Sequence, residues 1–136
     1  MINYRRTLIH VMAAAAVALM AAPGIAQAPA SNWPNKPIRY IVNFAPGGTT
    51  DILARTIGEK LGAALGQPIV VENKPGQGGS IGAAELARAA PDGYTIGAGT
   101  ISSHAINATL YDKLSYDPIT SFAPITLYAT QPNVLL

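Results

Sequence analysis

Hydrophobic residues follow two different periods along most of the chain. Short apolar runs such as "IRYIV" and "PIVV" are typical of buried strands, whereas the leucine and isoleucine residues between positions 53 and 65 recur at every fourth position, as on one face of a helix. We predict strands at 38–44, 68–72 and 94–100, helices near 51–65 and 80–90, and a third helical segment at 101–111. Gly66 is expected to end the first helix. Strands that alternate with helices predict an α/β fold with right-handed crossovers and a parallel sheet.

A turn rich in glycine and hydroxyl residues follows each predicted strand: "APGGTTD", "KPGQGGS" and "GTISSH". In a parallel sheet these turns share one edge, and each leads into a helix whose first N–H groups are unpaired. We predict an anion-binding cleft there, with the N–H groups of Gly48, Thr49, Gly79 and Ser80 directed into one concavity. A tight turn between strand and helix needs similar residues for structural reasons alone, and Thr49 and Ser80 could be helix caps.

The first 28 residues have the pattern of a signal peptide. The segment "MINYRR" is positively charged, an alanine-rich apolar stretch too short for a confident membrane span follows, and "PGIAQAPAS" supplies small residues for cleavage between positions 26 and 30. An uncleaved anchor is the alternative. The chain has no cysteine, so it carries neither a disulfide framework nor a thiol for a lipid anchor. We therefore expect a soluble periplasmic protein.

Composition and charge narrow the class of partner. With 136 residues, 49% of them hydrophobic and 12% charged, the chain fits one small globular domain. Two of the nine basic residues, Arg5 and Arg6, lie in the predicted leader, which leaves seven basic against seven acidic residues. This balance provides no basic face, and a nucleic acid partner is not expected.

Several catalytic and cofactor chemistries lack part of their required pattern. The spacing of Gly76, Gly78 and Gly82 loosely resembles a dinucleotide fingerprint, but no acidic residue ends the following predicted strand, and the first turn has no Gly-Lys-Ser/Thr sequence. Ser102, Ser103 and His104 are adjacent without a nucleophile elbow around them. His104 could be a donor that faces a ligand or a packed ring.

The acidic residues are scattered along the chain, so a dedicated metal site is not expected. Most of these carboxylates are expected to be solvated. Asp51 is expected to favour the first turn of its helix electrostatically.

The residues after position 33 resemble the Bug family, the periplasmic substrate-binding receptors of tripartite tricarboxylate transporters. The segments that carry the resemblance are "WPNKPIRYIVNFAPGGTTDILAR", "LGQPIVVENKPGQGGSIGAAELARAAPDGYTIGAGT", "HAINATLY" and "LSYDPITSFAPITLYATQPNVLL". The resemblance implies a two-lobed periplasmic-binding-protein-like fold (type II) that closes on small organic carboxylates, such as di- or tricarboxylates, amino acids or aromatic acids, and presents them to membrane permease subunits. It implies no catalysis and no cofactor. An exported sensory or interaction module built on the same lobe is the alternative, followed by a dinucleotide-dependent enzyme.

The resemblance also implies a set of ligand-binding residues in the three turns. They are Phe44, Ala45, Pro46, Gly47, Gly48, Thr49, Thr50 and Asp51 in the first turn, Gly78, Gly79 and Ser80 in the second, and Thr100, Ser102, His104 and Asn107 in the third.

Such receptors need roughly twice this many residues, so the resemblance leads us to expect that the chain is a fragment of a receptor. We expect residues 29–121 to form the first α/β lobe and residues 122–136 to begin the crossover toward a second lobe. One lobe of this length can enclose a modest core.

Overall fold

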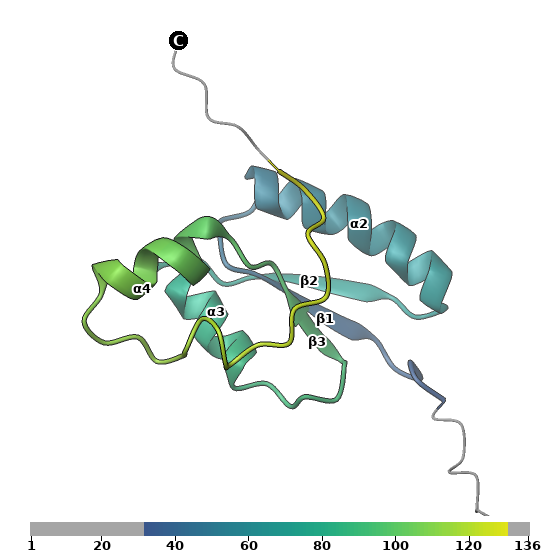
Figure 1. Cartoon of the computed structure of the whole chain (residues 1–136). Helices are drawn as coiled ribbons and strands as arrows, with labels where there is room; N and C mark the ends of the chain where they lie inside the picture. Colours follow the sequence, from purple (N-terminus) through teal and green to yellow (C-terminus); the bar gives the residue numbers. More distant parts are fainter. Residues whose placement is uncertain (1–31, 131–136) are drawn as a thin grey trace, which may run out of the picture. The chain divides into compact units, whose positions relative to one another are not determined.

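The structure, a computed structural model, describes residues 32–130, so the predicted signal peptide and residues 131–136 lie outside the described residues. The regular elements are β1 (Ile38–Val42), α2 (Thr49–Leu65), β2 (Ile69–Asn73), α3 (Ser80–Ala87), β3 (Thr95–Gly97) and α4 (Asn107–Leu110) (Figure 1). A 3-10 turn at Gln77–Gly79 precedes α3, and a π-helical turn at Ser102–Ile106 precedes α4. Within the described part of the chain, no helix is long and apolar enough to cross a membrane.

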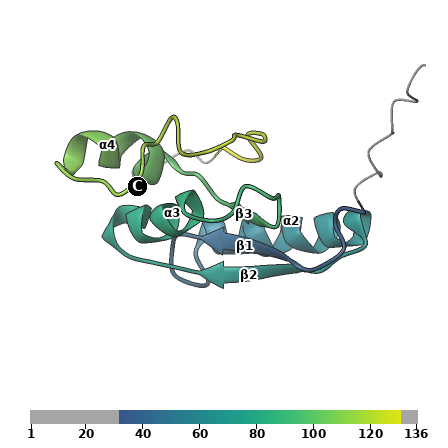
Figure 2. The same cartoon turned by 90° about the horizontal axis from the view of Figure 1, so that it is seen from below.

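The sheet is parallel, as predicted, with β1 in the centre. Its order is β2-β1-β3, and the register pairs Tyr40 with Val71 on one side and with Ile96 on the other. Figure 2 shows the arrows of β1 and β2 pointing the same way. The carboxyl ends of the strands therefore lie at one edge of the sheet.

The two longer helices cover opposite faces of this sheet (Figure 1). Alternate residues of β1 face opposite sides. Tyr40 and Val42 pack with Ala54 of α2, whereas the next residue after the strand, Asn43, backs onto Gly82 of α3. A second small core joins Ala83 and Ala84 of α3 to the ring of Tyr116. The layered α/β arrangement predicted from the sequence is confirmed.

Element ends differ from the predicted ends for identifiable reasons. Helix α2 stops where predicted, because Gly66 adopts the left-handed conformation with φ of 70°. Helix α3 ends at Ala87 rather than at 90, because the Arg88 and Ala89 N–H groups donate to the carbonyl oxygens three residues earlier and Pro91 then disfavours helical backbone at Ala90. Strand β3 covers only Thr95–Gly97, because the chain leaves the sheet at Gly99, which packs against the ring of His104.

The chain after α4 is irregular. From position 111 to 130 it forms turns and extended segments without helix or strand. Ile119, Ile125 and Leu127 are each at least 80% exposed. The predicted start of a crossover, at 122–130, thus has no regular structure here.

Candidate functional site

The three predicted turns meet at the carboxyl edge of the sheet. A Cβ atom added at Gly79, in the second turn, would lie 2.9 Å from Asn43 Nδ2 and 3.3 Å from Phe44 Cζ in the first. Asn107, in α4 after the third turn, donates from Nδ2 to the carbonyl oxygen of Gly78 at 3.0 Å. The prediction that the turns share one edge is confirmed. The predicted direction of the Gly79 and Ser80 N–H groups was wrong, because they donate to the carbonyl oxygens of Gly76 and Gln77 inside the second turn. For Gly48 and Thr49 it stays a prediction.

The first turn is tied to α2 and β2 through Asp51. Its carboxylate accepts bonds from the Gly47 N–H and from Asn73 Nδ2, each at 2.9 Å, and from Arg55 Nε at 3.1 Å. Asn73 Nδ2 also donates to the carbonyl oxygen of Phe44 at 3.0 Å. These bonds hold the turn in place from the helix side.

Asp51 is buried, unlike the solvated carboxylates that most acidic residues of the chain were expected to be. The residue is only 4% exposed, and the Arg55 guanidinium, followed by the Gly47 N–H and the Asn73 amide, lowers its pKa to about 2. Asp51 is therefore ionised at neutral pH, with both oxygens engaged inside the protein. Direct contact between Asp51 and a ligand stays a prediction.

The rest of the first turn is open to solvent. Residues 45–49 are exposed, and Phe44 and Thr50 are half-buried. Gly47, with φ of 82°, has no atom near the position of a Cβ. A ligand can reach this backbone, because no side chain stands over it.

No side chain caps α2 or α3. The N-cap of α2 is Gly48, and the N-cap of α3 is Gly79, so Thr49 and Ser80 are the first residues inside their helices. The alternative that Thr49 and Ser80 are caps was wrong. At the start of α3 the Gly79 and Ser80 N–H groups donate to the carbonyl oxygens of Gly76 and Gln77, whereas no capping side chain uses the first N–H groups of α2, which suits an anion.

The backbone of the second turn contains three consecutive residues in the left-handed conformation. Gln77, Gly78 and Gly79 have φ values of 51°, 61° and 91°, in the left-handed region. Gln77 is a non-glycine residue there, which is uncommon. Ser80, just after the turn, is 4% exposed, and its hydroxyl accepts a bond from Asn107 Nδ2 at 2.8 Å.

The third turn is organised around Ser103, which the sequence did not single out as a site residue. Ser103 is fully buried, accepts a bond from the Thr100 N–H at 3.2 Å, and contacts His104 Nδ1 at 2.8 Å. Ser102, which was predicted instead, is half-buried. Ser102 and Ser103 are the same type of residue and differ in how deeply they are buried. The sequence alone does not reveal that difference.

His104 has the environment of a packed ring. Its ring lies 4.6 Å from that of Phe122 and 6.3 Å from that of Tyr116, between centroids, and touches Gly99. Burial lowers its pKa, so the imidazole is neutral at neutral pH. A neutral ring can still offer one N–H to a ligand.

Sequence reasoning missed Asn43 and Asn73. Asn43 directly follows β1, and Asn73 is the last residue of β2, where it pairs with Val42. Asn43 is 2% exposed, and neither polar atom of its amide has a hydrogen-bond partner in the described structure. A polar residue at the end of an apolar strand was the available signal for both. Sequence reasoning also missed Tyr116, whose hydroxyl donates to the carbonyl oxygen of Ser103, and no local sequence pattern marked it.

Other features lie away from this edge or are lacking in the described part. A hollow of about 530 Å³ lies between the later turns of α2 and the start of β2, beside Gly58, Gly62 and Pro68. It does not include the predicted residues. Among residues 32–130, no group of three His, Asp or Glu side chains could hold a metal ion.

Comparisons with known proteins agree with the resemblance seen in the sequence. The sequence pattern of the family described as "Tripartite tricarboxylate transporter family receptor" matches residues 53–136. Protein BugT of Bordetella pertussis is 38% identical over 108 residues, which cover 79% of this chain and 33% of BugT. The chain spans about a third of the length of the curated relatives it matches.

Solved structures share the fold. The periplasmic binding protein BugD is 45% identical with a TM-score of 0.63, over 68% of this chain and 31% of BugD. MatC from Rhodopseudomonas palustris, solved with bound malate, is 41% identical with a TM-score of 0.65, over 68% of this chain and 31% of MatC. Another R. palustris protein, solved with adipate, is 42% identical with a TM-score of 0.63, over 65% of this chain and 29% of that one. The parallel α/β lobe is thus that of periplasmic binding proteins.

Proposed function

The chain belongs to the family of tripartite tricarboxylate transporter receptors, and we propose that it supplies one carboxylate-binding lobe of such a receptor. The observation that carries the proposal is the meeting of three turns at one sheet edge, with two helix N-termini that no side chain caps. A carboxylate is a planar anion that accepts several N–H bonds at once, so backbone donors suit it.

The charges near the turns favour binding through neutral donors. Arg55 is engaged by the buried Asp51 and by Asn73 Oδ1 at 3.1 Å, and His104 is neutral at neutral pH. The remaining donors are backbone N–H groups of the exposed residues in the first turn and the hydroxyls of Thr49, which is exposed, and Thr50, which is half-buried. Such a site selects a carboxylate by geometry more than by net charge.

We assign the ligand to dicarboxylates of about the size of malate and adipate, because structural neighbours at 41% and 42% identity were solved with these acids. We further propose that the receptor works in the periplasm and delivers its ligand to membrane permease subunits. The family description and the neighbouring periplasmic proteins support this. Catalysis is not part of the proposal.

A titration followed by NMR tests the binding site. Malate or adipate added to the ¹⁵N-labelled chain should shift the amide signals of Gly48 and Thr49 progressively as the concentration of the acid rises. The dimethyl ester of the same acid is the control, because it keeps the carbon skeleton and lacks the charge. Equal shifts with acid and ester, or no shift of these amide signals with any dicarboxylate, would overturn the proposed function.

A further inference from the structure

A continuous run of hydrogen bonds joins the second turn to the third through Asn107, Ser80, Tyr116 and Ser103. We propose that Asn107 and Tyr116 are positioning residues, which hold these two turns as one preformed half of the binding edge without touching the ligand. The proposal rests on the proposed function, and it changes the role expected for Asn107 and Ser80.

Asn107 uses both of its amide hydrogens on the second turn. Its Nδ2 atom donates to the carbonyl oxygen of Gly78 at 3.0 Å, with Gln77 O at 3.4 Å, and to Ser80 Oγ at 2.8 Å. Asn107 is 2% exposed. An amide nitrogen has two hydrogens, so none remains for a ligand.

The direction of the remaining bonds follows from the donors. The Tyr116 hydroxyl donates its single hydrogen to the carbonyl oxygen of Ser103 at 2.5 Å, because a carbonyl can only accept. In the longer contact of 3.4 Å between Ser80 Oγ and Tyr116 OH, Ser80 must therefore be the donor. The bonds run one way, from Asn107 through Ser80 and Tyr116 to Ser103, an arrangement in which each bond polarises the next.

Burial makes this run of bonds sensitive to substitution. Ser80, Ser103 and Asn107 are at most 4% exposed, and Tyr116 is 7% exposed. A buried donor or acceptor that loses its partner is destabilised, because water cannot replace the bond. Loss of one hydroxyl or amide from this run should therefore loosen both the second turn and the third turn.

The second turn is the part that needs support. It contains three consecutive residues with positive φ. This backbone conformation is sterically unfavourable for Gln77, and fixing it costs the two glycines conformational entropy. Asn107 holds the two carbonyl groups at the centre of this backbone. The N–H groups that start α3 keep their direction only while those carbonyls stay in place, which links Asn107 to ligand affinity.

Hydrogen exchange measured by NMR on the full 136-residue chain without ligand tests the coupling. Tyr116→Phe removes one oxygen, and Asn107→Asp replaces the donor NH2 with an acceptor of the same shape. In both variants, exchange should accelerate about fivefold or more at residues 78–82 and at residues 103–104, consistent with the loss of one ordinary hydrogen bond. Exchange in β1 should stay unchanged, because it reports global opening.

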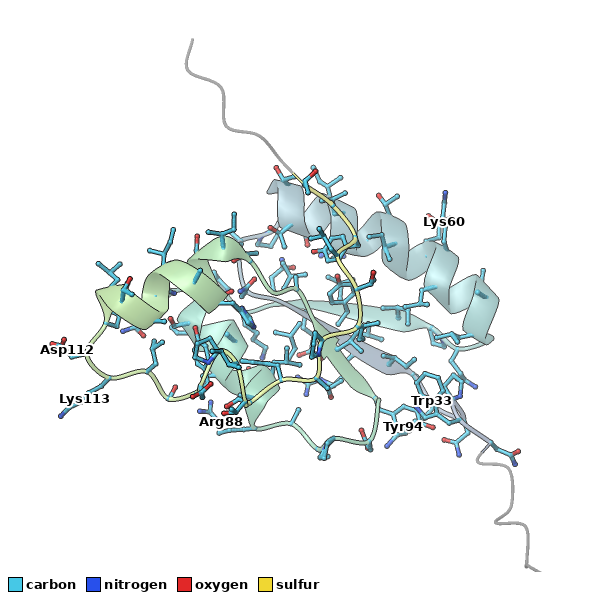
Figure 3. All side chains as sticks on the ribbon, in the orientation of Figure 1. Trp33, Lys60, Arg88, Tyr94, Asp112 and Lys113 are labelled. Atoms are coloured by element: carbon cyan, nitrogen blue, oxygen red, sulfur yellow. The ribbon has the colours of Figure 1, made fainter. Side chains whose placement is uncertain are left out.

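Tyr94→Phe is the matched control. The Tyr94 hydroxyl is also hydrogen bonded, donating to Asn35 Oδ1 at 2.9 Å, but it lies beside Trp33, far from α4 (Figure 3). This variant should leave exchange in both turns unchanged. Faster exchange in only one turn, or a uniform increase that includes β1, would overturn the proposal.

The same variants are then titrated with malate and adipate. If the turns are positioned for binding, the dissociation constant of the better ligand should rise about fivefold in Tyr116→Phe and stay unchanged in Tyr94→Phe. Unchanged affinity together with loosened turns would overturn the positioning role while the proposed function stands. If the original chain binds neither acid, the proposed function fails, and the exchange data alone decide whether the turns are coupled.

Discussion

Asp51 shows how one residue fixes the shape of the first turn. The chain buries a carboxylate beside a glycine-rich loop, and it does so without a net unpaired charge because Arg55 lies one helical turn away. The Gly47 N–H and the Asn73 amide complete the set of donors. A turn that a ligand can approach from outside is thereby held from the inside.

Acid unfolding should reveal this role. The folded pKa of Asp51, about 2, is below its ordinary value of 3.8, so its contribution to stability is present above pH 4 and is lost as pH falls toward 2. Asp51→Asn should remove that part of the pH dependence, so that the difference in unfolding free energy from the original chain shrinks across this window. Denaturant unfolding at several pH values measures it.

The matched control for this experiment is Asp112→Asn, at an exposed residue near the end of α4 (Figure 3). This substitution should leave the change in unfolding free energy between pH 4 and pH 2 as it is in the original chain. A difference between Asp51→Asn and the original chain that is constant from pH 7 to pH 2 would show that the carboxylate is not held as the hydrogen bonds indicate.

His104 should titrate below the ordinary histidine range. Burial lowers its pKa from 6.5, so the folded protein takes up this proton less readily than the unfolded chain does. Stability is therefore full above pH 6.5 and decreases as pH falls from 6.5 toward the lower folded value. A proton NMR titration of the imidazole, assigned by its loss in His104→Asn, checks the direction. A midpoint at or above 6.5 would contradict the packed environment.

At the level of elements, the sequence predicted what local patterns determine. The central strand and helix α2 follow directly from their apolar periods, and the position of Gly66 fixed the end of that helix. The length of β3 was overestimated because the contact of Gly99 with His104 has no local signal. For α3, Pro91 was a local signal of an earlier end. The turns were located correctly from their composition.

Much of the site could not be predicted residue by residue. The turns owe their shape to bonds between residues far apart in sequence, as between Asn107 and Gly78 or between Asn73 and Asp51. The type of a residue does not tell whether its amide faces a ligand or another turn. Only the packing of α3 and α4 against the sheet decides this.

Close packing of helices on the sheet predicts a graded response to added methyl groups. A Cβ at Gly82 would lie 2.8 Å from the Cα of Asn43 and 2.9 Å from the carbonyl oxygen of Lys74, whereas a Cβ at Gly58 would lie 3.3 Å from a methyl group of Ile69. Gly82→Ala should lower the unfolding free energy by about 1–3 kcal/mol, because backbone must shift. Gly58→Ala should change it by less than about 1 kcal/mol, since better helix propensity offsets the tight contact.

Chemical denaturation of these two variants measures the gradient. Equal effects of Gly82→Ala and Gly58→Ala would mean that α3 does not approach β1 as closely as the structure shows. A loss concentrated in Gly58→Ala would point instead to the packing of α2 on β2.

At the scale of the whole molecule, the residues of the proposed site meet at one edge of the sheet. The chain spans about a third of the length of its curated relatives and 29–31% of BugD, MatC and the R. palustris protein solved with adipate. Receptors that close around a ligand gain affinity from contacts on both sides and from exclusion of water. The described residues supply donors from one side, and the first turn among them is exposed to solvent.

Affinity should reflect this one-sided arrangement. A dicarboxylate at the edge keeps much of its hydration, and each hydrogen bond forms in a medium of high dielectric constant, where charge-assisted bonds are weak. We therefore predict that the 136-residue chain binds dicarboxylates of four to six carbons at roughly millimolar strength or worse, about 4 kcal/mol or less. A chimera that continues the chain with the corresponding part of BugD should bind at micromolar strength or tighter. Titration calorimetry of both proteins, with sedimentation to detect dimers, tests this prediction. Micromolar binding by a monomeric 136-residue chain would show that one edge suffices. Micromolar binding by a dimer would show that two copies build the enclosed site.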